Sequence, residues 1–278
     1  NAVEPFIHDA DIIFHLAAAV GVKFIVNNPI KTLQTNTKST ENILKLATLN
    51  GKKRVILAST SEVYGDSREI PFREDSNLLI GPPDSPRWGY ACSKLMDEFL
   101  AAAYHQEYGL PVVILRLFNT VGPRQLGHYG MVLPTFIAQA LEQSPITVYG
   151  DGKQTRSFTW VKDVVHGMIQ ISQVESAGGQ IFNLGSGNEI EIKELANLVK
   201  EVLGSSSEIV YLSTEFINLL MPFRVSGILP LTPHRLADES VAKRKSAQPA
   251  WARIHPDRTA GGHRDHRHPR KPAAPGAW

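Results

Sequence analysis

Short apolar segments alternate with longer segments of helical periodicity over the first 212 residues of the chain. Four of the apolar segments are DIIFHLAA (11–18), KRVILAS (53–59), PVVILRLFN (111–119) and QIFNLG (180–185). Apolar runs of this length are typical of parallel strands that are buried on both faces. Parallel strands need long, usually helical, connections, and the intervening segments supply them. The sequence therefore predicts an α/β protein with a mostly parallel sheet.

The segments between these strands carry apolar residues at the spacing of a helix. IKTLQTNTKSTENILKLATL (30–49) follows a proline, and GYACSKLMDEFLAAAYHQEYG (89–109) ends at a glycine, which are typical helix boundaries. We expect further helices and two short strands in the second half of the chain, at 131–143, 146–150, 160–174, 191–204 and 208–212.

The chain changes character after about residue 213. Residues 224–278 hold 11 Lys and Arg against 4 Asp and Glu, with seven prolines and no sustained period. Such a segment cannot bury enough apolar surface to offset its chain entropy, so 213–278 is predicted to be an atypical, disordered basic tail. The histidines at 263, 266 and 268 suggest a metal site as the alternative, but no cage of further ligands accompanies them. A shifted reading frame and a real basic extension both explain this composition.

Composition also excludes several classes of function. Residues 1–223 hold 18 Lys and Arg against 23 Asp and Glu, so this mildly acidic body is not expected to bind nucleic acid. No run approaches eighteen apolar residues, and the first residues do not form a signal segment. Cys92 is the single cysteine, so no internal disulfide can form. A cytoplasmic protein without a membrane partner is predicted.

Three of the predicted strands end in polar or small residues. HLAAA (15–19), STSE (59–62) and FNTVGPR (118–124) each follow an apolar run. In open α/β sheets ligands bind beyond the carboxyl ends of the strands, so these three segments are expected around one crevice. The second of them crowds three hydroxyls and a carboxylate at a strand end, which indicates proton transfer.

Tyr90 and Lys94 follow on the next predicted helix, four residues apart and therefore on one helical face. An ammonium close to a phenol favours the phenolate and so lowers the pKa of the phenol toward that of a useful base. Alone the pair is weak evidence, because a chain with seven tyrosines often contains this spacing by chance.

Several ordered motifs together give a stronger indication. The stretch from about residue 10 to about residue 212 resembles the extended short-chain dehydrogenase/reductase family, which contains nucleotide-sugar epimerases, dehydratases and decarboxylases. This resemblance implies a Rossmann-like doubly wound parallel sheet with a smaller substrate lobe, NAD as cofactor, a nucleotide sugar such as a UDP-sugar as substrate, and a homodimer. The motifs that carry it are HLAAAVGV, TNTKSTENIL, STSEVYG, YACSK, RLFNTVGPR, ITVYGDGKQTRSFTWVKDVV and FNLGSG.

The resemblance implies roles for individual residues. Tyr90 would be the base that takes the proton from O4 of the sugar while hydride passes from C4 to NAD. Lys94 would hold the nicotinamide ribose and lower the pKa of Tyr90, and Thr60 would polarise O4. The further cofactor contacts that it implies are Leu16, Ala17, Ala18, Ala19 and Ser59. The residues that it places at the substrate are Asn119, Tyr149 and Arg156, the last on phosphate.

The triplet Thr60-Ser61-Glu62 resembles that of UDP-glucuronate decarboxylases, and also that of GDP-mannose dehydratases. Oxidation at C4 of a hexuronic acid creates a β-keto acid, which loses CO2 through an enolate. Ser61 and Glu62 would orient the carboxylate or manage the protons, and PRWGY (86–90) is similar to a decarboxylase segment. The best specific prediction is a UDP-glucuronate decarboxylase. A UDP-glucose 4-epimerase, and an inactive truncated remnant that binds sugar nucleotide or dimerises, stay open.

One departure from the family bears on the organisation of the chain. No strand followed by G-x-x-G-x-x-G precedes residue 11, so an incomplete sheet without its first βαβ part, and weak or no NAD binding, are predicted. The predicted domains are a remnant of the NAD-binding domain at 1–119, to which 158–183 returns, and a substrate lobe at 120–157 and 184–212. The family's usual dimer would pair helices at about 32–48 and 89–108, with Leu95, Phe99, Ala102 and Ala103 as apolar surface.

Overall fold

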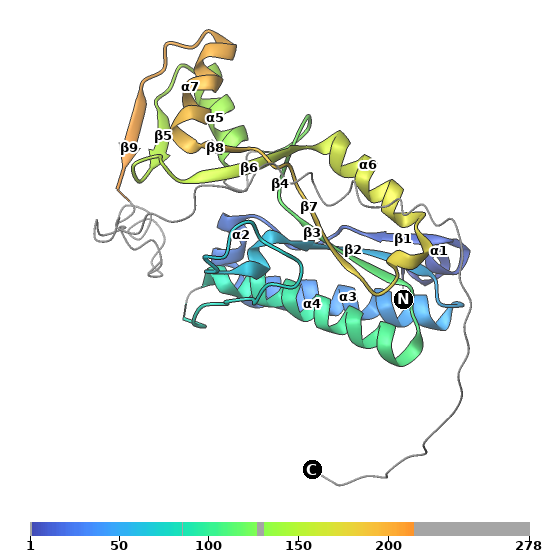
Figure 1. Cartoon of the computed structure of the whole chain (residues 1–278). Helices are drawn as coiled ribbons and strands as arrows, with labels where there is room; N and C mark the ends of the chain where they lie inside the picture. The colour runs from blue at the N-terminus through green and yellow to red at the C-terminus, as the bar shows by residue number, and fades with distance from the viewer. Residues whose placement is uncertain (1, 85, 127–130, 214–278) are drawn as a thin grey trace, which may run out of the picture. The chain divides into compact units, whose positions relative to one another are not determined.

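The structure is a computed structural model that describes residues 2–84, 86–126 and 131–213 (Figure 1). Strands and helices alternate along this part of the chain, as the sequence predicts. The tail predicted from residue 213 onward lies outside the described residues except for its first residue. In chain order the elements are α1 (Glu4–Asp9), β1 (Ile12–His15), α2 (Val22–Asn27), α3 (Pro29–Leu49), β2 (Arg54–Thr60), the 3-10 helix η1 (Ser61–Tyr64), α4 (Pro86–Tyr108), β3 (Val112–Leu117), β4 (Asn119–Val121), α5 (Val132–Leu141), β5 (Ile146–Tyr149), β6 (Thr155–Trp160), α6 (Val161–Ser172), the 3-10 helix η3 (Glu175–Ala177), β7 (Ile181–Leu184), β8 (Glu189–Glu191), α7 (Ile192–Leu203) and β9 (Ile209–Leu212).

The main sheet has four strands in the order β1-β2-β3-β7, and every neighbouring pair is parallel. Its two central strands are the apolar runs of β2 and β3, where Val55, Ile56 and Leu57 are fully buried beside Val112–Leu115. A parallel strand with neighbours on both edges and helices on both faces has no exposed side, which explains the continuous apolar sequence.

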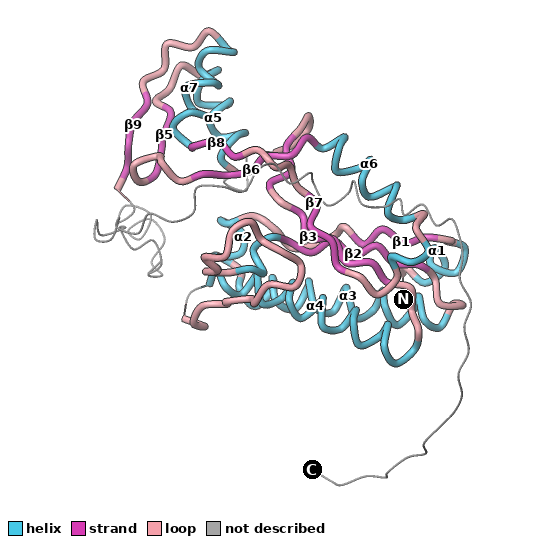
Figure 2. The backbone as a smooth tube through the Cα atoms, in the orientation of Figure 1, coloured by secondary structure: helices cyan, strands magenta, loops and turns pink. Residues whose placement is uncertain are grey.

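Helices cover both faces of this sheet, so it is doubly wound as predicted (Figures 1 and 2). On one face, Val55 and Leu57 pack with Leu44 of α3 and Ala101 of α4. On the other face, Ile56 packs with residues of α6. Successive residues of a strand point to opposite faces, so β2 contributes to both layers of core. The Rossmann-like α/β class is therefore confirmed.

A second group of elements follows β3. Strands β4, β6 and β8 form one small sheet, β5 and β9 pair in parallel, and α5 packs with α7. The core of this group joins Phe136 of α5, Ile146 and Val148 of β5, and Leu195 of α7. The chain returns to the main sheet through α6 and β7. The exact boundaries of the predicted substrate lobe stay a prediction.

Candidate active site

The parallel register brings the predicted strand ends to one edge of the main sheet. His15 is the last residue of β1, Thr60 is the last residue of β2, and Thr60 lies opposite Leu117, the last residue of β3. The loop after β1 and the helical turn η1 after β2 therefore start at the same edge, as expected for ligand binding in open α/β sheets.

Thr60 begins the turn that carries the predicted acid–base triplet. Its hydroxyl accepts a hydrogen bond from the backbone N–H of Glu62 at 3.3 Å, so Thr60 caps η1 in addition to any catalytic role. Ser61 is half-buried and Glu62 is exposed. Thr60 also hydrogen-bonds Tyr90, and the negative charge of Glu62 acts on the same phenol. The predicted base, the predicted hydroxyl and the extra carboxylate thus share one site.

The surroundings of Tyr90 act on the pKa of its phenol. Burial of the phenol raises its pKa well above the ordinary value, and the charges of Glu62 and Asp97 raise it further, while the hydrogen bond with Thr60 opposes the shift. That Lys94 lowers the pKa of Tyr90 stays a prediction. The ammonium is occupied by another carboxylate, which the sequence reasoning did not consider.

That carboxylate belongs to Asp97, one turn further along α4. The Nζ of Lys94 lies 2.7 Å from Oδ2 of Asp97, and the two side chains are only 4% and 0% exposed. His15 packs nearby and bonds the hydroxyl of Thr40 on α3 through Nε2 at 3.1 Å. Burial, followed by the positive charge of Lys94, lowers the pKa of His15 from 6.5 to about 4, so this imidazole is neutral near pH 7.

Asn36 of α3 is a positioning residue that the sequence analysis missed. Its Oδ1 accepts the backbone N–H of Ala19 at 2.7 Å, and its Nδ2 donates to the hydroxyl of Ser93 at 3.0 Å. Asn36 thereby fixes the loop after β1 to the helix that carries Tyr90. A signal was present in the sequence, because Thr32, Asn36 and Thr40 recur every four residues and form a polar stripe that is fully buried.

Ser59 is held inside the protein. Its hydroxyl donates to Oε1 of Glu98 at 2.5 Å, and the side chain is buried. The guanidinium of Arg116 on β3 binds the same carboxylate and also donates to the hydroxyl of Tyr64 at 3.0 Å. Ser59 is therefore committed to a structural network through its side chain, and its predicted contact with the cofactor stays a prediction.

The other predicted cofactor residues form the loop between β1 and α2. Leu16 and Ala17 are exposed, and Ala18 and Ala19 are half-buried. The small side chains of Ala17, Ala18 and Ala19 leave the backbone of the loop approachable at the carboxyl edge of the sheet. That arrangement fits the nicotinamide end of a dinucleotide. Within residues 2–84, 86–126 and 131–213, no turn with three glycines joins a strand to a helix, so no residue is assigned to the pyrophosphate.

The predicted substrate residues lie on the second group of elements. Asn119 begins β4, is exposed, and donates through Nδ2 to the carbonyl of Ser157 at 3.0 Å. Tyr149 ends β5 with 40% of its surface exposed. Arg156 is exposed on β6 and donates to the carbonyl of Thr155. All three have exposed surface, and their roles at the substrate stay predictions.

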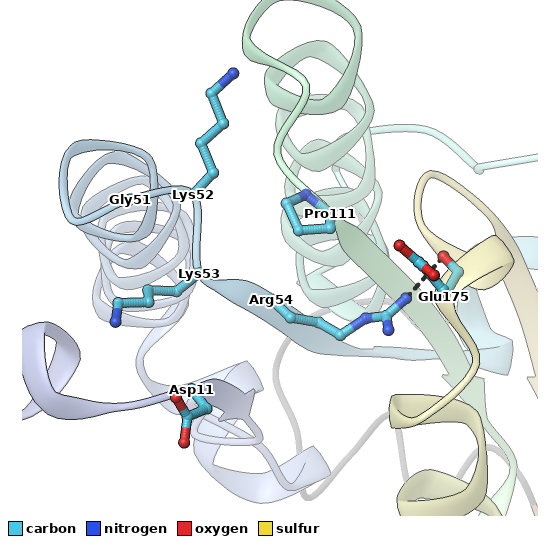
Figure 3. A pocket seen from close by; sticks show the side chains of 7 residues that line it. All are labelled: Asp11, Gly51, Lys52, Lys53, Arg54, Pro111 and Glu175. Atoms are coloured by element: carbon cyan, nitrogen blue, oxygen red, sulfur yellow. Dashed lines mark hydrogen bonds between the residues drawn. The ribbon is translucent and has the colours of Figure 1, made fainter.

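A separate hollow of about 340 Å³ lies at the opposite, amino edge of the main sheet (Figure 3). Arg54, which borders it, donates to the carbonyls of Ser172, Val174 and Glu175 and so closes the end of α6. This edge is the one that open α/β sheets do not use for ligands. Its lining residues are Asp11, Gly51, Lys52, Lys53, Arg54, Pro111 and Glu175.

The described residues contain no group of three or more His, Cys, Asp and Glu side chains placed to hold a metal ion. The three histidines considered above lie outside them. In the same part of the chain, every helix is too short or too polar to cross a bilayer.

A Rossmann-like sheet with a Tyr-x-x-x-Lys pair beside the carboxyl ends of its strands defines a class of dinucleotide-dependent proteins. Residues 1–185 match the model of the NAD dependent epimerase/dehydratase family. The chain belongs to this family.

Among the curated relatives, a UDP-N-acetyl-alpha-D-glucosaminuronate decarboxylase of Bacillus cytotoxicus is 44% identical over 216 residues, which are 77% of this chain and 66% of the relative. UDP-glucuronic acid decarboxylase 1 of Arabidopsis thaliana is 42% identical over 211 residues, or 76% of this chain and 48% of the relative. The chain thus spans between about half and two thirds of the length of these relatives.

Solved structures are similar over a comparable range. A UDP-glucuronic acid 4-epimerase from Bacillus cereus, in complex with UDP-glucuronic acid and NAD, superposes with a TM-score of 0.69 at 28% identity, covering 81% of this chain and 73% of that one. A UDP-N-acetylglucosamine 4-epimerase from Methanobrevibacter ruminantium gives a TM-score of 0.70 at 33% identity, covering 77% and 67%.

Proposed function

We propose that the protein is an NAD-dependent decarboxylase of a UDP-hexuronate, which oxidises C4 of the sugar before CO2 is lost. The observation that carries this assignment is the placement of Glu62, whose charge acts on Tyr90 at the same site as the hydroxyl of Thr60. A C4 oxidation alone needs a base and a polarising hydroxyl. A carboxylate beside the phenol adds a group for a second proton transfer. Relatives that are decarboxylases of UDP-uronates support the same choice.

The cofactor would be held at its nicotinamide end by the loop 16–19, by Tyr90 and by Lys94. When bound, NAD accepts the hydride that leaves C4 of the sugar. The loop is fixed for this task by Asn36, which binds both backbone groups of Ala19. Small side chains at 17–19 let the ring approach the backbone, as larger ones would not.

Tyr90 would remove the proton from O4 of the sugar as the base, and the hydroxyl of Thr60, which bonds Tyr90, would donate to O4. The resulting ketone lies β to the C6 carboxylate of a uronate, so the C5–C6 electron pair can move into an enolate as CO2 leaves. For a pentose to form, a proton must then return to C5 and a hydride to C4, so that the cofactor ends the cycle oxidised. Glu62, or Ser61 beside it, would deliver that proton or hold the C6 carboxylate in position.

A 4-epimerase is the second candidate, and its support is specific. The Bacillus cereus neighbour is a UDP-glucuronic acid 4-epimerase, so the same fold accepts a uronate without losing its carboxyl group in that protein. Both candidates share Tyr90, Lys94 and Thr60. They differ in what happens to C6, which makes the mass of the product decisive.

The test is an incubation of the protein with NAD in large excess, because weak NAD binding is predicted, and with either UDP-glucuronate or its 2-acetamido counterpart, followed by mass spectrometry of the sugar nucleotide. A decarboxylase gives a UDP-pentose, or its 2-acetamido counterpart, lighter than the substrate by one CO2, with one CO2 released per product. Formation of an isomer of unchanged mass, without CO2, would establish the epimerase instead. If the protein binds the sugar nucleotide saturably but forms neither product, the third alternative, an inactive remnant that binds sugar nucleotide, would be supported.

We also propose a homodimer through the outer face of α3 and α4. Apolar side chains there are exposed, including Ile30 and Leu33 of α3 and Phe99 of α4, the last 65% exposed. Ala102 and Ala103 are exposed as expected, and Leu95 is half-buried. Light scattering checks this: a Phe99→Glu variant should be a monomer at concentrations where the wild type is a dimer, and a wild-type monomer would contradict it.

The cytoplasm is the location we propose, since Cys92 is an exposed free thiol.

A further inference from the structure

The turn η1 carries Ser61 and Glu62, but it is too short to fix them by itself. It has only four residues, and the hydrogen bonds of a 3-10 helix are poorer than those of an α-helix. Thr60 is held differently, because it pairs with Leu117 inside the main sheet. A catalytic group must be held in place by its neighbours, and a misplacement of about 1 Å can cost about 100-fold in rate. Whatever anchors η1 therefore decides how well Glu62 can act.

Tyr64, the last residue of η1, has its side chain inside the protein. The side chain is fully buried, and its ring stacks on that of Phe72 with 4.5 Å between the ring centroids. Its hydroxyl lies 3.0 Å from Nη1 of Arg116 on β3 and 2.7 Å from Oδ1 of Asn183 on β7. These two residues lie opposite each other on neighbouring strands. The hydroxyl thus joins the end of η1 to the carboxyl end of the main sheet.

The direction of each hydrogen bond in this group follows from the chemistry of the donors. A guanidinium can only donate, so the hydroxyl of Tyr64 accepts from Arg116. The single hydrogen of the hydroxyl is then free for Asn183, whose Oδ1 accepts it. Asn183 in turn donates through Nδ2 to the carbonyl of Phe72 at 3.1 Å. The hydroxyl of Tyr64 therefore both accepts and donates, and the two partners cannot exchange these roles.

The backbone around Tyr64 is fixed as well. Its carbonyl accepts the N–H groups of Ser67 and Leu79 at 3.2 and 3.3 Å. The N–H of Gly65 donates to the carbonyl of Glu62 at 3.0 Å and so closes η1. Because this closing bond lies next to the anchored residue, a loss of the anchor should reach Glu62 directly.

We propose, on the basis of the proposed function, that Tyr64 is a positioning residue: the anchoring of its hydroxyl to β3 and β7 fixes η1 and thereby holds Ser61 and Glu62 at the end of β2. Tyr64 is buried, has no contact with substrate in this scheme, and acts through the rest of the turn. Thr60 depends on it less, because the sheet holds Thr60. Tyr64 therefore matters more for the second proton transfer than for the oxidation at C4.

The experiment compares amide hydrogen exchange, measured by NMR, in the ligand-free wild type and in Tyr64→Phe. This change removes only the hydroxyl and keeps a ring to stack on Phe72. The amides of Glu62 and Gly65, which bond at the two ends of η1, should exchange about ten times faster relative to the amide of Ile56 in the core of β2. An increase in their exchange that is no larger than the increase at Ile56 overturns the role of Tyr64.

Asn183→Ala tests the same anchor from its other side, and it keeps the proposal testable if Tyr64→Phe does not fold. It removes the acceptor of the Tyr64 hydroxyl and leaves Tyr64 itself intact. Exchange at Glu62 and Gly65 should again be faster, and wild-type exchange at both amides overturns the proposal. Tyr104→Phe is the matched control, because it removes a hydroxyl from another tyrosine whose ring packs against the core of the main sheet. It should leave both amides unchanged.

The exchange measurement needs neither NAD nor substrate, so its outcome is independent of which reaction the protein catalyses. Faster exchange at η1 in Tyr64→Phe, without any CO2 from the wild type, would confirm the anchor and contradict only the decarboxylase assignment.

Turnover of a UDP-hexuronate separates positioning from a purely structural role. In Tyr64→Phe the rate of CO2 release should fall about tenfold or more, with an unchanged KM for the sugar nucleotide and a smaller loss of NAD reduction. A purely structural role would lower both rates equally, in proportion to the amount of folded protein, and that outcome overturns the positioning of Glu62 by Tyr64.

Discussion

Glu98 and Arg116 form a two-pronged ion pair in the core, with Nε 3.0 Å from Oε1 and Nη2 2.7 Å from Oε2. The pair joins α4, which carries Tyr90, to β3 in the middle of the main sheet. The two side chains are only 5% and 3% exposed. Because a buried ion that loses its partner stays uncompensated, the pair fixes the helix against the sheet much more strongly than a surface pair would.

We predict that Arg116→Met lowers the free energy of unfolding by about 3–5 kcal/mol, because Glu98 is left buried and unpaired. Replacing both residues, as in Glu98→Leu with Arg116→Met, should cost clearly less. Urea denaturation followed by circular dichroism measures both. Arg73 and Asp75 supply the control, since this pair is about three quarters exposed and Arg73→Met should not change the midpoint. Equal losses in the single and double variants would contradict the prediction.

His15 predicts a pH dependence of stability with a definite sign. Its pKa is about 4 in the folded protein and 6.5 without the burial, so the unfolded chain binds the extra proton between these values. Stability from the neutral imidazole is complete above pH 6.5, is lost as the pH falls toward 4, and changes no further below that. The loss amounts to about 3 kcal/mol.

The measurement compares chemical denaturation of the wild type and His15→Gln at pH 7 and at pH 4.5. The glutamine keeps a hydrogen-bonding group toward Thr40 but does not titrate. The wild type should lose about 2–3 kcal/mol more than the variant over this interval. The same comparison for His8→Gln, at an exposed histidine, should show no difference. An equal pH dependence with and without His15 would show that its titration is not linked to folding.

The sequence predicts the main sheet because its strands are continuous apolar runs. It predicts the helix at 89–109 because the helical pattern continues over many residues, and the structure has a helix at Pro86–Tyr108 there. It gives no sign of α1 and α2, each six residues long, or of the three-residue strands β4 and β8. Elements that short carry less than two periods of any pattern, and tertiary contacts define them.

The candidate site was predictable only in part. Position arithmetic on the helix places Tyr90 and Lys94 on one face, and the same arithmetic places Asp97 there as well. The sequence does not show that Lys94 forms an ion pair with Asp97. That pairing depends on the burial of both side chains and on the 2.7 Å distance between them. The role of Asn36 depends likewise on a contact with Ala19, a residue seventeen positions away.

Gly65, which ends η1, is predicted to be intolerant of any side chain. Its φ of 62° with ψ of −129° is a conformation that glycine alone adopts readily, and a Cβ there would overlap the carbonyl oxygen of Leu79. Gly204 has nearly the same φ, 60°, but nothing lies within 4 Å of its Cβ position. Gly204→Ala should therefore cost about 1 kcal/mol, and Gly65→Ala several times more. Thermal unfolding of the two variants, compared with the wild type, measures this difference. Similar losses of stability in both variants would show that the backbone at Leu79 can move to make room for the side chain.

The last prediction separates the roles of Glu62 in η1 and Tyr90 near the start of α4. Tyr90→Phe removes the base that both chemical routes need, so all turnover, including reduction of NAD, should be lost. Glu62→Gln leaves Tyr90 and Lys94 in place and removes one acid–base group, which typically contributes about 10²–10⁴-fold. Release of CO2 from a UDP-hexuronate should fall by that factor, while slow reduction of NAD, read at the absorbance of NADH, continues. Glu69→Gln, an exposed glutamate a few residues further on, is the matched control and should turn over like the wild type. Loss of NAD reduction in Glu62→Gln, to the same extent as CO2 release, would mean that Glu62 serves the first step and that decarboxylation needs no separate group.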